Sequence, residues 1–415
     1  MQYGLIGRKL SHSFSAEIHS KLADYNYELY PIEPEKLDDF FAKKDFKAIN
    51  VTIPYKEAVI PYLYYIDPLA KKIGAVNTII NKNGKLFGYN TDFFGMTQMI
   101  KRSGIDVKGK TAAVLGSGGT CKTALTVLSE LGAKKCYIVS RTADNNRISY
   151  QDLYKVADNI DIILNTTPCG MFPDSEKSAV ETDKFKNLSG VIDVIYNPLK
   201  TKLTSDAQKS NIKNINGLYM LVAQAALASS LFTDDESVLL KCDKVYSEIL
   251  KEKTNIVLIG MPGCGKTTIG KNLAKKLNRK FTDSDEEFIK RKKMSISDYF
   301  NKYSEKEFRD AETEIISEIC KNQSQIIATG GGIVTKRQNI DYLKKNGLII
   351  FLDKDIKLLQ IGNGRPLTSN ADALKKKYNE RYPLYNDYCD LKINISNDLN
   401  ENTDLILKSL SEMIL

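Results

Sequence analysis

A glycine-rich segment past the middle of the 415-residue chain most limits how this sequence can fold. Residues 260–267 read Gly-Met-Pro-Gly-Cys-Gly-Lys-Thr and match the phosphate-loop pattern G-x-x-x-x-G-K-[ST]. The apolar run 255–259 precedes this loop, and a helical pattern through Leu273, Ala274 and Leu277 follows it. A strand, a loop and a helix in this order predict a parallel α/β sheet whose backbone N–H groups bind nucleotide phosphates.

The position of the loop also sets the domain organisation. In such a loop we expect Lys266 to reach the β and γ phosphates and the Thr267 hydroxyl to bind Mg²⁺. The loop begins only at residue 260, and 415 residues exceed the roughly 100 to 200 of an ordinary domain. At least one further α/β unit must therefore precede the nucleotide-binding unit.

Composition excludes several classes of protein. The seven cysteines are scattered and form no C-x-x-C pair, so we expect reduced thiols, no zinc site and a cytoplasmic location. No apolar run reaches the roughly 18 residues of a membrane span. The net charge of +9 comes from lysines spread along the chain, which favours a solvated lysine-rich surface over nucleic-acid binding and would also suit small anionic substrates. The only histidines are His12 and His19, so acid–base chemistry elsewhere must use Lys, Asp, Glu, Tyr or water.

A second glycine-rich turn lies in the first half of the chain. Residues 115–120 read Leu-Gly-Ser-Gly-Gly-Thr, between a strand-like run at 111–115 and an amphipathic pattern at 125–131. This order is typical of a dinucleotide-binding turn. The next strand-like run ends in Ser140-Arg141-Thr142, where an NAD site usually carries an acidic residue. Arg141 suits a 2′-phosphate, so the sequence favours NADP; a solvated loop arginine is the simpler alternative.

Alternating strand and helix patterns predict an α/β protein throughout. Strand-like runs at 2–6, 48–53 and 78–80 indicate an N-terminal α/β piece. Runs at 161–165 and 191–196 extend the dinucleotide unit into a doubly wound fold. Helical patterns follow at 218–231 and 238–251. We therefore predict three domains: a substrate domain from residues 1–103 and 216–250, a Rossmann-like NADP domain from 104–215, and a P-loop domain with a parallel sheet from 253–415.

Short polar clusters occur at expected strand ends and turns of the first half. Before the dinucleotide turn they lie at 11–15, 50–56, 74–78 and 90–92, and after it at 165–171, 193–198 and 216–225. Each cluster alone has an ordinary explanation, because Ser and Asn favour turns, Lys56 could be a surface lysine and Asp92 could start a helix. Together and in this order they resemble the shikimate dehydrogenase family over residues 1 to about 250.

This resemblance implies a set of site residues. Lys56 and Asp92 would be the catalytic pair, which also contacts substrate. The other implied substrate-binding residues are Ser13, Ser15, Thr52, Asn77, Tyr196 and Gln224. The implied NADP-binding residues are Gly116, Ser117, Gly118, Gly119, Thr120, Ser140, Arg141, Thr142, Val194 and Gly217. The chemistry agrees with the scarcity of histidine, because an ammonium beside a carboxylate can donate a proton as hydride reaches a ring ketone.

The chain departs from the family at three positions. Lys9 and Ala16 stand where Pro is common, which affects loop rigidity more than chemistry. Phe93 stands where Gly is common, which predicts an altered pocket wall and substrate range.

The second half has its own ordered motifs at 281–285, 304–312, 328–332, 364–367 and 381–385. A kinase for a small carboxylated polyol needs a carboxylate at the acceptor hydroxyl, arginines for the substrate carboxylate and a close backbone surface. Asp285, Arg309 with Arg381, and the glycine triplet 330–332 provide these groups. Helix caps, surface ion pairs and a plain turn are the alternatives. The motif order resembles shikimate kinase over residues 255 to about 397.

By this second resemblance, shikimate contacts Asp285, Arg309, Gly331 and Arg381, with Asp285 and Lys266 catalytic. Thr267 and Asp283 would serve Mg²⁺, and Arg365 would belong to a lid over ATP. The full set of expected ATP-binding residues is Gly260, Gly263, Cys264, Gly265, Lys266, Thr267, Thr268 and Arg365. Ser304 replaces a common Gly, and the segment 359–364 is shorter than the usual approach to the lid, which predicts altered nucleotide affinity and lid closure.

Together the two resemblances predict a bifunctional enzyme with NADP(H) and ATP–Mg²⁺ as cofactors and 3-dehydroshikimate and shikimate as small-molecule substrates. The expected reactions are NADPH-dependent reduction, then phosphorylation, in the formation of chorismate and aromatic amino acids. One alternative is a quinate-type dehydrogenase joined to a kinase of another specificity. A second is a ligand-sensing regulator, against which the intact Lys56, Asp92, Lys266 and Asp285 argue. The sequence does not determine the oligomeric state.

Overall fold

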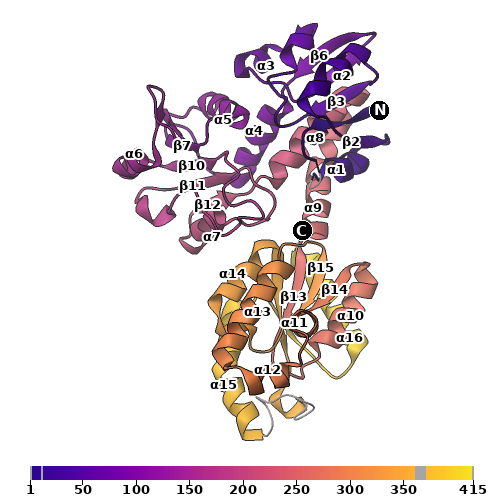
Figure 1. The fold of residues 1–415 in the computed structure, drawn as a ribbon, viewed down its shortest axis with the longest axis vertical. Coiled ribbons are helices and arrows are strands. Elements are labelled where there is room, and N and C mark those ends of the chain that lie inside the picture. The colour runs from indigo at the N-terminus through magenta and orange to yellow at the C-terminus, as the bar shows by residue number, and fades with distance from the viewer. Residues whose placement is uncertain (1, 11–12, 360–370, 414–415) are drawn as a thin grey trace. The chain divides into compact units, whose positions relative to one another are not determined.

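The computed structural model describes residues 2–10, 13–359 and 371–413. The chain divides into two compact units, Met1–Ile249 and Leu250–Leu415 (Figure 1). Within the described residues, the first unit contains two six-stranded sheets and the second unit a five-stranded sheet. The prediction of an α/β protein is therefore confirmed.

The first sheet belongs to the N-terminal part of the first unit. Its strand order is β2-β1-β3-β5-β6-β4, with β1, β2 and β3 parallel and β5–β6 an antiparallel hairpin. Asn83 and Gly84 both have positive φ and close this hairpin, as expected for an Asn-Gly turn. The strands are β1 (Tyr3–Gly7), β2 (Tyr27–Pro31), β3 (Ala48–Val51), β4 (Tyr65–Ile66), β5 (Thr78–Lys82) and β6 (Lys85–Tyr89), and the helices are α1 (Ser15–Leu22), α2 (Leu37–Lys43) and α3 (Pro68–Ile73).

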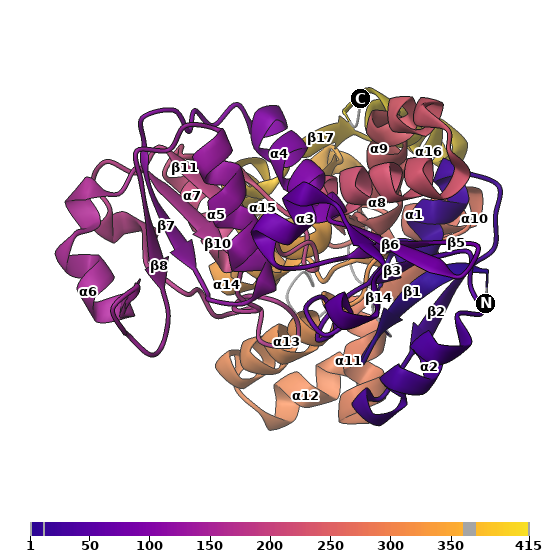
Figure 2. The same cartoon turned by 90° about the horizontal axis from the view of Figure 1, so that it is seen from above.

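The second sheet is entirely parallel, with the order β12-β11-β10-β7-β8-β9. Successive residues of β7 alternate between two cores, because Ala112 and Val114 face α4 and α5 whereas Ala113 and Leu115 face α6 and α7 (Figures 1 and 2). The chain reverses its direction across the sheet between β7 and β10, which is where open α/β sheets bind ligands. The strands are β7 (Thr111–Leu115), β8 (Lys135–Val139), β9 (Arg147–Ile148), β10 (Ile162–Asn165), β11 (Gly190–Asp193) and β12 (Lys213–Ile215), and the helices are α5 (Gly119–Glu130), α6 (Tyr150–Lys155) and α7 (Lys202–Lys209).

Two long helices complete the first unit. Helix α4 (Thr91–Ser103) packs against α8 (Leu218–Thr233), which also packs against α1. A Cβ atom on Gly95 would lie 2.5 Å from the Met220 carbonyl oxygen, so only glycine allows the two backbones to approach this closely. Helix α9 (Cys242–Lys253) follows and crosses the boundary between the units.

The second unit contains a parallel sheet with the order β14-β15-β13-β16-β17. The loop 260–265 joins the fully buried β13 to α10, so the predicted strand–loop–helix is present. The strands are β13 (Asn255–Ile259), β14 (Lys280–Asp283), β15 (Gln325–Ala328), β16 (Gly347–Asp353) and β17 (Leu391–Asn394). The helices are α10 (Lys266–Leu277), α11 (Ser284–Lys292), α12 (Ile296–Lys302), α13 (Glu305–Ile319), α14 (Arg337–Asn346), α15 (Ala371–Tyr388) and α16 (Leu399–Met413).

Several element ends differ from the sequence prediction. Strand β3 ends at Val51 because Thr52 begins a turn that the Tyr55 N–H closes. Strand β11 ends at Asp193, three residues early, because the backbone of Val194 turns away to contact Gly217. Helix α9 starts at Cys242 because the preceding residues form a 3₁₀ helix. The 3₁₀ helices are Pro34–Lys36, Ile60–Tyr62, Ala157–Asn159, Thr182–Lys184, Glu236–Lys241, Ile333–Thr335 and Ile356–Leu358.

Candidate active sites

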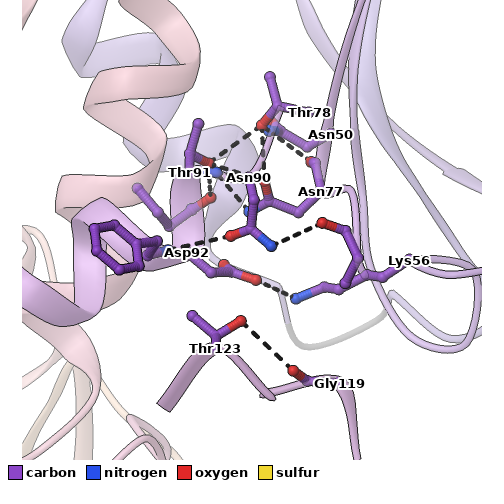
Figure 3. A network of polar contacts seen from close by, with 12 residues as sticks. Asn50, Lys56, Asn77, Thr78, Asn90, Thr91, Asp92, Gly119 and Thr123 are labelled. Carbon is purple, nitrogen blue, oxygen red and sulfur yellow. Dashed lines mark hydrogen bonds and ion pairs between the residues drawn. The ribbon is translucent and has the colours of Figure 1, made fainter. Parts of the chain in front are cut away.

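An ammonium–carboxylate pair lies between the turn after β3 and the first turn of α4. The Lys56 Nζ atom donates to Asp92 Oδ2 at 2.6 Å, and the two side chains are 18% and 10% exposed (Figure 3). Figure 3 also shows Gly119 and Thr123, in the first two turns of α5, beside this pair. Helices α4 and α5 pack against each other. The predicted pair is thus formed and lies next to the dinucleotide turn.

Asparagine side chains fix the start of α4. Asn90 caps the helix, because its Oδ1 accepts the Phe93 N–H at 3.2 Å while its Nδ2 donates to the Ala75 carbonyl at 2.9 Å. Asn77 Oδ1 accepts the Thr91 N–H at 2.7 Å. These bonds hold the backbone on either side of Asp92, so the carboxylate is presented by a rigid helix terminus.

The other predicted substrate residues lie in several segments of the first unit. The Ser13 hydroxyl donates to Ser15 Oγ at 3.0 Å, and the ring of Phe14, between them, lies 5.1 Å from the ring of Tyr196. Gln224 on α8 accepts from the Thr91 hydroxyl at 3.4 Å. Burial raises the pKa of Tyr196, so its hydroxyl keeps its proton at neutral pH. Thr52 lies directly after β3, at its carboxyl end.

The dinucleotide turn joins β7 to α5. A Cβ atom on Gly118 or Gly119 would meet nothing within 4 Å, so the N-terminus of α5 is open to a ligand. On the other side, a Cβ atom on Gly116 would lie 2.7 Å from Thr166 Oγ1, so this glycine allows the loop after β10 to approach the turn. Ser117 and Thr120 belong to the same turn. The open helix N-terminus suits a pyrophosphate.

Two arginines follow β8 and differ in their partners. The Arg147 Nε atom donates to Asp144 at 2.7 Å. Arg141 is exposed and makes no hydrogen bond or ion pair with any residue that the structure describes. The Ser140 hydroxyl donates to the Thr142 carbonyl oxygen, which holds this turn together. The Arg141 guanidinium is therefore available to an anion.

The segment after β11 packs closely on the start of α8. A Cβ atom on Gly217 would lie 1.9 Å from the Val194 carbonyl oxygen, so the two backbones are in direct contact. Asp193 is fully buried and accepts from Thr201 Oγ1 at 2.7 Å, Asn165 Nδ2 at 3.0 Å and the Ile195 N–H at 3.1 Å. Burial raises the pKa of Asp193 to about 6, and these three hydrogen bonds oppose the shift.

In the second unit, the phosphate loop has positive φ at Gly260, Gly263 and Gly265. Lys266 is 8% exposed, and its Nζ donates to the carbonyl oxygens of Gly260 and Met261, both at 2.9 Å. Backbone oxygens therefore hold the ammonium at the loop.

A hydroxyl and two carboxylates lie next to the phosphate loop. Thr267 Oγ1 donates to Asp283 Oδ2 at 2.8 Å, and the other oxygen of Asp283 accepts the N–H groups of Asp285 and Glu286. Asp283 therefore caps α11 and binds the phosphate-loop threonine at once, and it orients Asp285 in the first turn of that helix.

The glycine triplet 330–332 touches three predicted site elements. A Cβ atom would lie 2.7 Å from Asp285 Oδ1 if placed on Gly330 and 2.7 Å from the Pro262 ring if placed on Gly331. On Gly332 it would lie 2.3 Å from both Nη atoms of Arg309. The Tyr385 hydroxyl donates to the Gly331 carbonyl at 2.5 Å. A side chain at any of these positions would displace a neighbouring group, and the triplet joins the phosphate loop to the acceptor side of the site.

Two arginines at this site keep unused donors. Arg309 donates to Glu312 at 2.9 Å and to Glu305 at 3.3 Å, but its Nε has no partner among the described residues. Arg381 is 2% exposed, and its Nε and Nη2 also have no partner there. Buried guanidinium donors require an acceptor, so the site suits a carboxylate or a phosphate.

Known proteins resemble each half of the chain. Residues 5–79 match the family model "Shikimate dehydrogenase substrate binding domain". The shikimate dehydrogenase (NADP(+)) of Clostridium beijerinckii is 40% identical over 247 residues, which are 56% of this chain and 92% of that protein. The chain belongs to the shikimate dehydrogenase family. Residues 262–411 match the family model "Shikimate kinase", so the chain joins a shikimate dehydrogenase to a shikimate kinase domain.

Solved structures agree with this assignment over the dehydrogenase half. Shikimate dehydrogenase 1 from Peptoclostridium difficile is 37% identical, with a TM-score of 0.55 over 60% of this chain and 98% of that one. The shikimate 5-dehydrogenase of Thermus thermophilus, solved with NADP(H) and shikimate, is 28% identical, with a TM-score of 0.53 over 59% and 99%. The dehydrogenase–kinase chain is an enzyme for both activities, with NADP and ATP as cofactors.

The cofactors fit the residues of the dehydrogenase–kinase. The open N-terminus of α5 and the free Arg141 suit the phosphates of NADP, and the phosphate loop with Lys266 suits those of ATP. Oxygen ligands suit Mg²⁺, and Thr267 and Asp283 provide them. The described residues hold no group of three or more His, Cys, Asp or Glu side chains placed as metal ligands, and none of their helices is long and apolar enough to cross a membrane. The predicted ATP residue Arg365 lies outside the described residues.

One residue of the kinase site had no role in the sequence prediction. Glu312 is 4% exposed on α13 and pairs with Arg309, one turn earlier on the same face. Burial raises the pKa of Glu312, whereas the ion pair with Arg309 opposes the shift. The i, i+3 spacing of the two residues is the sequence signal that could have indicated this pair.

Proposed function

We propose that the chain catalyses two consecutive reactions, the NADPH-dependent reduction of 3-dehydroshikimate to shikimate and the ATP-dependent phosphorylation of shikimate to shikimate 3-phosphate. The observation that carries the proposal is the Lys56–Asp92 pair at 2.6 Å, in a chain that also holds a phosphate loop beside two buried arginines. The product of the first reaction is the substrate of the second. Both steps belong to the formation of chorismate and aromatic amino acids.

We assign each activity to a part of the chain. The dehydrogenase substrate domain comprises residues 1–103 and 216–250, the NADP domain 104–215, and the kinase domain 253–415. The division is supported by the three sheets, because all strands of each sheet fall within one of these domains.

In the reduction, NADPH when bound supplies the hydride. As the ring carbonyl receives it, negative charge develops on the oxygen, and Lys56 donates a proton to that oxygen. Asp92 accepts a hydrogen bond from the ammonium and so orients it. The substrate is held by hydroxyl and amide side chains, which are those of Ser13, Ser15, Thr52, Asn77, Tyr196 and Gln224.

The NADP-binding residues follow the dinucleotide turn. Gly116 to Thr120 bind the pyrophosphate at the N-terminus of α5, and Ser140, Arg141 and Thr142 bind the 2′-phosphate. Val194 and Gly217, whose backbones are in contact, line the nicotinamide end.

In the phosphorylation, ATP when bound supplies the transferred phosphoryl group. Asp285 would accept the proton that the substrate 3-hydroxyl loses as this hydroxyl takes up the phosphoryl group and ADP leaves. Arg309 and Arg381 bind the substrate carboxylate through their unused N–H groups, and Gly331 lets the ring approach. Lys266, with Gly260, Gly263, Cys264, Gly265, Thr267, Thr268 and Arg365, holds the nucleotide, and Thr267 and Asp283 hold Mg²⁺.

One assay tests both steps in the full chain. 3-Dehydroshikimate, NADPH and MgATP are supplied together, and NADPH oxidation and phosphorylated product are measured. Lys56→Ala should abolish reduction yet leave phosphorylation of added shikimate intact, and Lys266→Ala should do the reverse. If either folded variant loses both activities, the two sites are not independent and the proposal fails. The same assay with quinate and NAD⁺ tests the alternative that the first half is a quinate-type dehydrogenase.

A further inference from the structure

A buried hydrogen-bond chain lies behind the Lys56–Asp92 pair and centres on Asn50, for which the proposed mechanism has no role. Asn50 lies on β3 and is 4% exposed. Its Oδ1 accepts the Tyr27 hydroxyl at 2.7 Å. Its Nδ2 donates to Thr78 Oγ1 at 3.0 Å and to the Asn77 carbonyl at 3.2 Å, and Figure 3 shows these three residues together. Both ends of the Asn50 amide are therefore used, and its orientation is fixed.

The chain continues from Asn50 to the Asn77 side chain. The Thr78 hydroxyl donates to Asn77 Oδ1 at 3.1 Å, and the Thr91 N–H donates to the same oxygen at 2.7 Å. Because both donors reach this oxygen, the Asn77 amide is oriented with its oxygen toward Thr78 and Thr91. Thr91 directly precedes Asp92, so the same bonds hold the helix turn that carries the catalytic carboxylate.

The other end of this hydrogen-bond chain is the Tyr27 hydroxyl. Tyr27 is buried, and its ring stacks on His19 at a centroid distance of 3.9 Å. Burial raises the pKa of Tyr27 well above its usual value, so the hydroxyl stays a donor, and burial lowers the pKa of His19 to about 3, so the imidazole stays neutral. Tyr27 and His19 therefore each keep one protonation state around neutral pH, which suits a role in orienting Asn50 rather than in proton transfer.

We propose that Asn50 is a positioning residue for the dehydrogenase reaction and that the hydrogen bond from the Tyr27 hydroxyl holds its side chain in place. This inference rests on the roles proposed for Asn77 and Asp92. Without the Tyr27 hydroxyl, Asn50 Oδ1 has lost its donor and the Asn50 side chain is held only by the bonds from its Nδ2, so Thr78 and Asn77, which it contacts, are held less tightly. Substrate then sits in an unproductive geometry more of the time, which lowers kcat. The NADP site, on the other sheet, is unaffected.

Tyr27→Phe and Tyr25→Phe form a matched pair in the full chain. Tyr25 belongs to the same aromatic cluster, but its hydroxyl bonds to His19 instead of Asn50. With Tyr27→Phe we expect kcat of the reductase to fall about fivefold to tenfold, which is the effect of losing one buried hydrogen bond. The primary deuterium isotope effect on kcat with C4-deuterated NADPH should rise. KM for NADPH and the kinase kcat should stay within about twofold of wild type, as should every parameter of Tyr25→Phe.

A second variant, Asn50→Ala, removes the whole link, and its thermal unfolding is followed in parallel. We expect a larger loss of reductase kcat than with Tyr27→Phe, and if Asn50→Ala unfolds, Tyr27→Phe decides alone. Equal losses in Tyr27→Phe and Tyr25→Phe, or a loss seen only in KM for NADPH, would overturn the inference while an active wild type upholds the proposed function. A wild-type chain that does not reduce 3-dehydroshikimate refutes both.

Discussion

Asp193→Asn should stabilise the first unit at neutral pH. Asp193 is fully buried, and its three hydrogen-bond donors, Thr201, Asn165 and the Ile195 N–H, are all uncharged. Burial raises the pKa of Asp193 from 3.8 to about 6. The folded state therefore binds this proton more tightly than the unfolded state does, so the stability it contributes is complete below about pH 3.8 and is lost as pH rises through about 6.

The magnitude follows from the shift. About two pKa units correspond to about 3 kcal/mol of unfolding free energy lost when the buried carboxylate is fully ionised. The amide of Asp193→Asn carries no charge and avoids this cost, but the Thr201 hydroxyl must now accept rather than donate, which costs about 1 kcal/mol. We expect the variant to be about 2 kcal/mol more stable than wild type at about pH 7.5. The difference should shrink by about 1.4 kcal/mol at about pH 5, where the wild-type carboxyl is mostly protonated.

The assay is urea unfolding of the full chain at these two pH values, with loss of NADPH-linked activity reporting the first unit. Kinase activity in the same samples is the internal reference, because Asp193 lies in the first unit. The matched control is Asp158→Asn, an exposed carboxylate paired with Lys186, for which we expect changes within about 0.5 kcal/mol at both pH values. If the gain from Asp193→Asn is the same at both pH values, ionisation of this carboxyl is not penalised by folding and the reasoning is wrong.

Two further substitutions test the cofactor and kinase sites. Arg141→Ala should raise KM for NADPH about tenfold or more and leave KM for NADH unchanged, because only NADPH carries the 2′-phosphate. Arg147 is already paired with Asp144, so the control Arg147→Ala should change neither KM. Equal effects of Arg141→Ala on both cofactors would contradict this assignment. Gly332→Ala should raise the kinase KM for shikimate about tenfold or more, because the new Cβ would lie 2.3 Å from the Arg309 guanidinium and displace it. A variant with the wild-type KM for shikimate would show that the kinase does not need the guanidinium in its present place.

The sequence predicted the elements and groups that depend on local order. The phosphate loop, the dinucleotide turn and Asp285 at the start of α11 follow from residues that are neighbours in the chain. The hairpin strand β6 was not predicted, although its Asn83-Gly84 turn is a strong local signal. This omission was avoidable.

Other features were beyond a sequence-based prediction because distant segments create them. Tyr27 and Asn50 are 23 positions apart, and their bond exists only because β2 and β3 both flank β1. Strand β11 stops at Asp193 because the Val194 backbone meets Gly217 of another segment. Whether Arg141 or Arg147 is free depends on which of them Asp144 binds, and the sequence order alone does not decide it.

Buried charge is arranged differently in the two units, in line with the reaction proposed for each. In the dehydrogenase, hydroxyl and amide groups surround the Lys56–Asp92 ion pair, which places charge where a proton must move. In the kinase, Arg309 already pairs with the carboxylates of Glu312 and Glu305, and a carboxylated substrate would add a further negative charge beside it. Burial already raises the pKa of Glu312, and an incoming carboxylate would compete with it for Arg309. Glu312 is therefore the group best placed to take up the proton that balances the site.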